Sequence, residues 1–263
     1  MSKHQVIERV YRTLGHPVDR ELLQTLMASS AQSDPEPAPA QGIAPQTDWN
    51  QCYLKKARRW CPALRHLPGV RAVFVCNTVA MGTATRTSDI DLFIVTERDR
   101  LWVARVLVTL YFQLLGLRRH GDKIAGRFCL SFFATADALD LSKIALKPHD
   151  PYLALWTATL IPVFGRSVGA RMLQANRAFV SDTLHCRLRL ERGLAQIPSG
   201  DSRLRNVLEL CFGKRCNAVW QRLLRPRAER KRDCLPDPSG TIISEHMLKF
   251  HDADRRREFL LES

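Results

Sequence analysis

One stretch decides the fold: residues 88–95, with the sequence SDIDLFIV. Its run of β-branched and aromatic residues predicts a strand. Because side chains alternate across a strand, we expect Asp89 and Asp91 on one face, and Ile90 and Leu92 on the other, in a core. Two neighbouring carboxylates repel each other unless a cation lies between them, and Mg²⁺ takes oxygen ligands of this kind. The alternative is a strand end whose two acids face water.

A buried strand and a turn of small residues come before the acidic strand. Residues 70–76 are apolar and mostly β-branched or aromatic, which predicts the first strand. Residues 77–87 are mostly small or hydroxyl-bearing, as expected of a turn. Backbone N–H groups in such a turn can approach a phosphate closely. Acids on the next strand would then hold the metal that bridges that phosphate.

This order resembles the nucleotidyltransferase superfamily that includes DNA polymerase beta, in which a Gly-Ser turn precedes an acid-x-acid strand. The chain is more similar to a group of bacterial, largely uncharacterised nucleotidyltransferase-domain proteins. Their turn reads roughly Gly-Ser-Leu-Ala-Met, and their strand reads Asp-Ile-Asp-Leu-x-Ile-Val-Thr. Here residues 77–81 match the turn and residues 89–96 match the strand, within a weaker likeness over residues 50 to 255. The resemblance implies an α/β (α+β) fold, with a small mixed sheet flanked by helices and a basic, helical C-terminal region.

The resemblance also implies roles for five residues. Asp89 and Asp91 would be the catalytic pair and would hold Mg²⁺ or Mn²⁺. Asn77 and Thr78, with nearby backbone N–H groups, would hold the triphosphate of an NTP, and Ser88 would support the turn. The implied reaction transfers a nucleoside monophosphate to an acceptor hydroxyl on a nucleic acid, a protein side chain or a small molecule.

Two departures from the family pattern leave a second interpretation open. Asn77 stands where the turn glycine would be, although Asn tolerates a positive φ better than most residues; Gly82 is a less fitting alternative. The expected third strand, residues 127–133, carries no carboxylate, and the later Asp137 and Asp140 are the candidates for a third acid. A catalytically degenerate protein that binds nucleotide or RNA is therefore the alternative to an enzyme.

The charge of the chain indicates a polyanionic partner. Its formal net charge is +14 and its sequence pI is about 9.9, and such proteins attract nucleic acids and nucleotides. A basic cluster lies near the C-terminus, with Trp220 as the nearest aromatic residue for stacking; it comprises Arg222, Arg225, Arg227, Arg230, Lys231 and Arg232. The cluster would bind nucleic acid through phosphates. It could equally be a solvated helix face, or a surface by which a scaffold protein binds an acidic partner.

The chain divides into four parts by composition. Residues 1–28 predict short helices, residues 29–47 a linker rich in Pro and Ala, residues 48–185 the nucleotidyltransferase-like domain, and residues 186–263 the basic helical region. Within the domain, residues 49–67, 101–117, 152–163 and 170–190 predict helices.

Cysteine usage and hydropathy suggest a cytoplasmic protein with no membrane partner. Eight cysteines without a signal peptide predict free thiols, and their spacing does not favour a zinc site. The apolar stretch 101–117 contains Arg105 and Gln113, so a helix buried against the sheet is the better interpretation than a membrane span.

Overall fold

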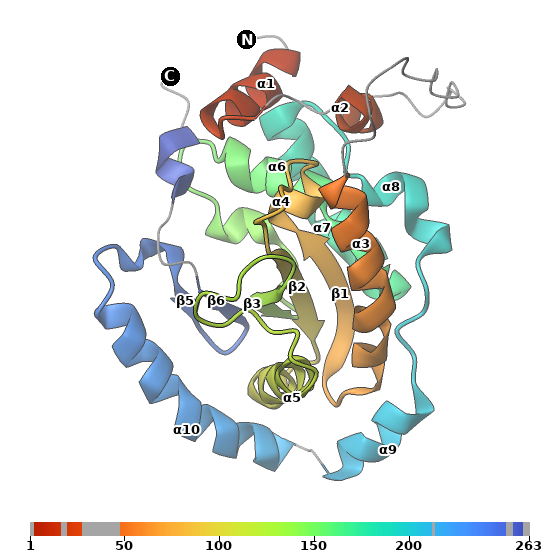
Figure 1. Cartoon of the computed structure of the whole chain (residues 1–263), viewed down its shortest axis with the longest axis vertical. Coiled ribbons are helices and arrows are strands. Elements are labelled where there is room, and N and C mark those ends of the chain that lie inside the picture. The colour runs from red at the N-terminus through yellow and green to blue at the C-terminus, as the bar shows by residue number, and fades with distance from the viewer. Residues whose placement is uncertain (1–2, 17–19, 28–47, 212–213, 251–254, 260–263) are drawn as a thin grey trace.

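The computed structural model describes residues 3–16, 20–27, 48–211, 214–250 and 255–259. Six strands form one sheet in the order β4-β1-β2-β3-β6-β5 (Figure 1). Their bounds are β1 Val70–Cys76, β2 Ile90–Thr96, β3 Phe128–Thr135, β4 Ile161–Phe164, β5 Ile242–Ile243 and β6 Met247–Lys249. Only β2 and β3 run parallel, and the other neighbours are antiparallel. The expected α+β fold with a small mixed sheet is therefore confirmed.

Helices cover both faces of the sheet, which makes three layers. The principal helices are α1 Lys3–Thr13, α2 Arg20–Met27, α3 Trp49–Trp60, α5 Leu101–Leu114, α6 Pro151–Thr159, α7 Arg166–Leu184, α9 Arg203–Cys211 and α10 Lys214–Asp233. One face of the sheet packs against α3 and α5, and the opposite face packs against α6 and α7. Because every residue of β2 is buried, its alternating side chains serve two cores rather than one.

The two faces of β2 are filled as the alternation predicts. Ile90 and Leu92 point into the core beside α3 and α5. Phe93 points the other way, where its ring lies 4.7 Å from that of Phe132 and 5.4 Å from that of Trp156, measured between centroids. The acids lie on the same face of β2 as Phe93, so Asp91 is next to the aromatic core on that face.

The N-terminal helices pack on the core beside α6. Ile7, Tyr11 and Leu26 are almost fully buried there. The Tyr11 hydroxyl donates a hydrogen bond of 2.7 Å to the carbonyl oxygen of Met81, just after the turn that follows β1. The predicted linker at 29–47 lies outside the described residues.

The first three strands and α5 lie where the sequence predicts them, and α5 is buried along one side as expected. Within the described part of the chain, no helix is both long enough and apolar enough to cross a membrane.

The predicted helix at 152–163 is wrong at its C-terminal end. Helix α6 ends at Thr159, and the chain continues directly into the edge strand β4. Proline interrupts a helix but is tolerated on an edge strand, where its missing N–H costs no ladder bond. Pro162 lies on such a strand, which pairs with β1 alone.

The region 186–263 is helical as predicted in α9 and α10, but it also supplies two strands that the sequence did not indicate. Strand β6 pairs with β3, and β5 pairs with β6. Helix α10 packs against α5, where the side-chain oxygen of Asn217 accepts the N–H groups of Trp102 at 2.9 Å and Val103 at 3.2 Å. These are unpaired donors in the first turn of α5, so α10 caps that helix.

Candidate metal and nucleotide site

The acid pair lies at the start of β2, between two neighbouring strands. Asp91 is opposite Cys76 of β1 and Cys129 of β3 in the sheet register. The ligand atoms of Asp89, Asp91 and Cys129 all lie within 4.8 Å of one another. Asp91 is only 7% exposed, and Asp89 is half-buried. The alternative that both acids simply face water is therefore wrong for Asp91.

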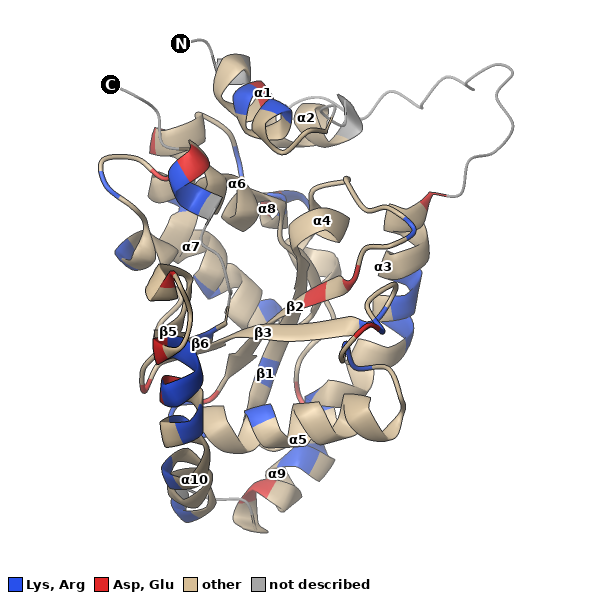
Figure 2. Ribbon diagram, turned by 60° about the vertical axis from the view of Figure 1, so that its left-hand side comes forward, with Lys and Arg blue, Asp and Glu red and all other residues tan. Residues whose placement is uncertain are grey.

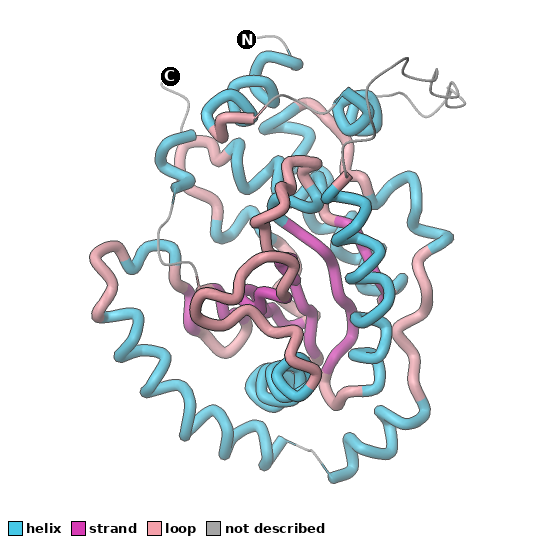
Figure 3. The backbone as a smooth tube through the Cα atoms, in the orientation of Figure 1, coloured by secondary structure: helices cyan, strands magenta, loops and turns pink. Residues whose placement is uncertain are grey.

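A cation from the protein already lies beside this pair. Arg119 donates a hydrogen bond of 2.7 Å from its guanidinium to Asp89 Oδ2 and lies 3.9 Å from Cys129 Sγ. It belongs to the loop between α5 and β3, which runs beside the acidic start of β2 (Figures 2 and 3). The sequence shows an Arg118-Arg119-His120 run, but nothing in its spacing from Asp89 indicates this contact.

The negative charge of ionised Asp91 is only partly offset by the groups around it. Burial, and secondarily the charge of Asp89, raise the pKa of Asp91 to about 6, while hydrogen bonds from Asn77 and Cys129 and the charge of Arg119 oppose that rise. A divalent cation between the two carboxylates would favour their ionised forms. The site therefore has a physical reason to attract a metal that an exposed pair of acids would lack.

Asn77 preserves the backbone conformation expected of the turn glycine. It has a φ of +54° at the first residue of the short helix α4, Asn77–Ala80, directly after β1. Its side-chain oxygen accepts a hydrogen bond of 2.7 Å from Trp156 Nε1, and its side chain also hydrogen-bonds Asp91. The turn and the acid pair are thus joined through one amide, which the sequence could not show.

Thr78 and Ser88 occupy different environments. The side-chain oxygen of Thr78 is buried and has no hydrogen-bond partner, although buried polar atoms normally have one. Ser88 closes the turn before β2: its side-chain oxygen accepts the Thr85 N–H at 2.9 Å, and its own N–H donates to the Thr85 carbonyl at 3.1 Å. Ser88 therefore supports the turn, while the Thr78 hydroxyl is shielded from solvent and has no partner among the described residues.

Among the described residues, no third carboxylate joins the pair. Asp137 and Asp140 follow the C-terminal end of β3, whereas Asp91 lies at the start of the parallel strand β2, roughly 20 Å away along the strands. Asp137 instead pairs with Arg98 and His246. In register with Asp91 stands Cys129, whose thiol pKa is raised by burial and by the two acids.

No family model matches the chain, and no curated protein matches it either. The chemistry of the site therefore has to be inferred from its own residues.

The basic cluster lies on α10, away from the acid pair (Figure 2). Arg225 pairs with Glu229 at 2.8 Å, and Arg232 pairs with Asp233 at 2.7 Å. Trp220, the nearest aromatic residue for stacking, is partly buried and packs against the core beside α5. Any nucleic-acid binding by α10 would thus depend on charge.

Replacing Arg227, Arg230, Lys231 and Arg232 together with Ser is expected to weaken the binding of a single-stranded oligonucleotide. Loss of phosphate contacts should also reduce the slope of log K against log salt by up to roughly 3. Titrations at several salt concentrations measure both quantities. If the affinity and the slope of the variant equal those of the wild type, α10 has no role in binding nucleic acid.

Proposed function

We propose that the protein is a metal-dependent nucleotidyltransferase, which transfers a nucleoside monophosphate from an NTP to an acceptor hydroxyl. One observation carries the proposal: a buried carboxylate with a raised pKa lies beside a second carboxylate and is joined to a tight turn by Asn77. Perturbed carboxylates of this kind cluster at functional sites.

The donor atoms fit Mg²⁺ or Mn²⁺ in part. Asp89 and Asp91 offer the carboxylate oxygens that these ions prefer, and Mg²⁺ commonly takes one or two carboxylates while phosphates and water fill its other positions. The neutral thiol of Cys129 is a poor ligand for either ion. When bound, the metal would neutralise charge on the phosphates and favour their reaction.

The residues of the chain would position the nucleotide. The unpartnered hydroxyl of Thr78 would donate to a phosphate oxygen. Asn77 would keep the turn open to the phosphates while it orients Asp91, and Arg119 would move from Asp89 to a phosphate when a metal takes its place. Positioning and charge neutralisation supply most of the rate in phosphoryl transfer.

Cys129 favours a second candidate function, the binding of nucleotide without turnover. It stands opposite Asp91, and no carboxylate of the described residues joins Asp89 and Asp91 within their cluster. Turnover distinguishes the enzyme from the binding protein, and metal-dependent nucleotide binding distinguishes both from a scaffold.

The proposal is tested by calorimetric titration with each of the four NTPs, with and without Mg²⁺ or Mn²⁺. We expect metal-dependent binding to the wild type and its loss in Asp89→Asn and in Asp91→Asn, because each removes a ligand. The exposed Asp182→Asn, on α7, serves as a control of equal charge change and should bind as the wild type does. Absence of binding to the wild type under every condition, or equal binding to all variants, would overturn the proposal.

A further inference from the structure

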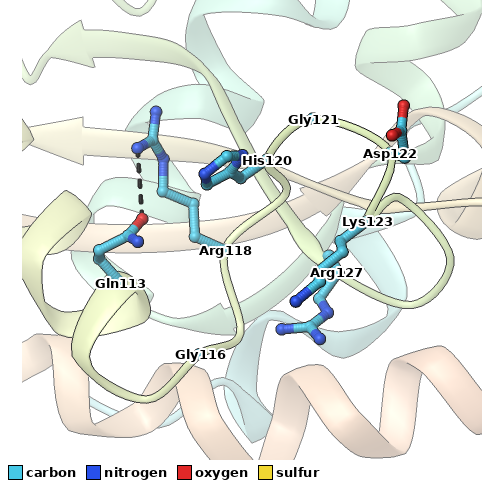
Figure 4. Close-up of a pocket in the computed structure, with 8 residues that line it drawn as sticks. All are labelled: Gln113, Gly116, Arg118, His120, Gly121, Asp122, Lys123 and Arg127. Atoms are coloured by element: carbon cyan, nitrogen blue, oxygen red, sulfur yellow. Dashed lines mark hydrogen bonds between the residues drawn. The ribbon is translucent and has the colours of Figure 1, made fainter.

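A basic cavity lies in the loop that also carries Arg119, and the proposed reaction has not used it. It has a volume of about 500 Å³ and lies between the end of α5 and the loop that leads to β3 (Figure 4). Its lining is Gln113, Gly116, Arg118, His120, Gly121, Asp122, Lys123 and Arg127. Three of these residues are permanent cations and only one is an acid, so the cavity attracts anions.

Two of the cations have no partner of their own. Within the described part of the chain, the side chains of Lys123 and Arg127 make no hydrogen bond or ion pair. The two extend in the same direction, while Asp122 points away from them (Figure 4). Like charges brought side by side repel each other, and an anion between them removes that cost.

Lys56 on α3 adds a third cation to this pair. Its ammonium group donates a hydrogen bond of 2.8 Å to the carbonyl oxygen of Gly126. Burial, and then the charge of Arg127, lower the pKa of Lys56. The positive charge of Arg127 therefore acts on α3 as well as on the loop.

The loop that forms the cavity is tied directly to the acidic strand. Gly126 N–H donates to the Ser88 carbonyl at 2.7 Å, and Ile90 N–H donates to the Arg127 carbonyl at 2.8 Å. Arg119, from the same loop, holds Asp89. The cavity and the acidic strand are thus linked through one loop.

We propose that this cavity binds the phosphate group of a small phosphorylated acceptor, an inference that rests on the proposed function. The volume falls within the range of small-molecule sites. No Phe, Tyr or Trp lines the cavity, whereas proteins that bind single-stranded nucleic acid stack bases on such side chains.

The proposed reaction transfers a nucleoside monophosphate to a hydroxyl of this acceptor. An acceptor hydroxyl oxygen forms a bond to the α-phosphorus of the NTP, and the bond from that phosphorus to the bridging oxygen breaks. Pyrophosphate leaves with the electron pair, and the hydroxyl proton passes to water. Lys123 and Arg127 take no part in bond changes and act by positioning the acceptor.

The experiment is calorimetric titration of the metal-free protein with inorganic phosphate, ribose 5-phosphate and a single-stranded oligonucleotide. The variant is Lys123→Gln/Arg127→Gln, and the matched control is Lys231→Gln/Arg227→Gln, which removes the same charges from α10. We expect ribose 5-phosphate to bind the wild type and the control equally, and the cavity variant roughly tenfold or more weakly, because charge-assisted hydrogen bonds are lost. Inorganic phosphate should follow the same order.

Three outcomes would overturn the inference: no binding of ribose 5-phosphate, an equal loss in both variants, or oligonucleotide binding that depends on Lys123 and Arg127 without binding of the sugar phosphate. Asp89→Asn separates this inference from the proposed function, because it should lose metal-dependent NTP binding and keep ribose 5-phosphate. If ribose 5-phosphate binds but no NTP does, nucleotidyl transfer is wrong and the phosphate site stands.

Discussion

Asp91→Asn should raise the melting temperature of the metal-free protein at pH 8 and change it little at pH 4. Burial and the charge of Asp89 raise the pKa of Asp91 to about 6 in the folded protein, against about 3.9 for an aspartate in an unfolded chain. At pH 8 the ionised carboxylate therefore destabilises the fold by roughly 3 kcal/mol. The neutral amide removes that penalty, and for a chain of this size the gain corresponds to roughly 6–12 °C.

The direction of the pH dependence follows from proton linkage. Between about pH 4 and pH 6 the folded protein binds this proton and the unfolded chain largely does not, so stability falls as the pH rises through that window. The difference between Asp91→Asn and the wild type should consequently open across the same window and stay constant above it. Thermal melts at intervals from pH 4 to pH 8 measure this difference.

Asp122→Asn is the matched control, since Asp122 is exposed on the loop before β3, and its melting temperature should track the wild type at every pH. An Asp91→Asn variant that is less stable than the wild type at pH 8 would contradict the prediction. It would mean that the hydrogen bonds from Asn77 and Cys129 and the nearby Arg119 stabilise the carboxylate more than burial opposes it.

The same variant connects stability with function. A divalent ion that binds the ionised pair should stabilise the wild type by an amount that grows with the logarithm of its concentration relative to its dissociation constant. It should leave Asp91→Asn unchanged, because that variant lacks a carboxylate ligand. If the wild type is less stable than Asp91→Asn without metal and more stable with metal, the carboxylate of Asp91 lowers the stability of the fold but is needed to bind the ion.

The strands near the site were predictable because their composition, their burial and the alternation of their side chains all indicate a strand. Residues 70–76 and 90–96 are apolar apart from Arg71, Asp91 and Thr96, and both strands are buried on both faces, as such runs indicate. The common face of Asp89 and Asp91 follows from the period of two alone. Short strands carry less information: β5 has two residues and β6 has three, so their pairing depends on α10 bringing the chain back to β3.

The residues that complete the site were harder to find, because they come from distant parts of the chain. Trp156 reads as one more apolar residue of α6, yet its ring N–H holds Asn77, which lies 79 positions earlier. Arg119 reads as part of a basic loop, and its pairing with Asp89 depends on the path of that loop after α5. Cys129 reads as a buried strand residue, and only the parallel register of β2 and β3 places it opposite Asp91.

A buried ion pair at the start of α6 helps to hold the turn that contains Asn77. Asp150 is 1% exposed and caps this helix by accepting the Leu153 N–H at 2.9 Å. Its other oxygen accepts the Leu146 N–H at 3.1 Å and the guanidinium of the buried Arg256 at 3.2 Å. Because α6 carries Trp156, this carboxylate fixes the helix that holds Asn77 in the site.

Asp150→Ala is expected to lower the free energy of unfolding by about 3–5 kcal/mol, because it removes a helix cap and leaves a buried guanidinium without its carboxylate. Asp150→Asn should cost less, since its amide oxygen can still cap the helix. Urea denaturation measures both. The penalty of the lost pair is separable: adding Arg256→Met to Asp150→Ala should restore part of the lost stability by removing the buried charge that Asp150 had balanced, even though Arg256 also donates to the Ile144 carbonyl. If the double variant is instead as unstable as the sum of the two single ones, the pair contributes no coupling and the loss belongs to the cap alone.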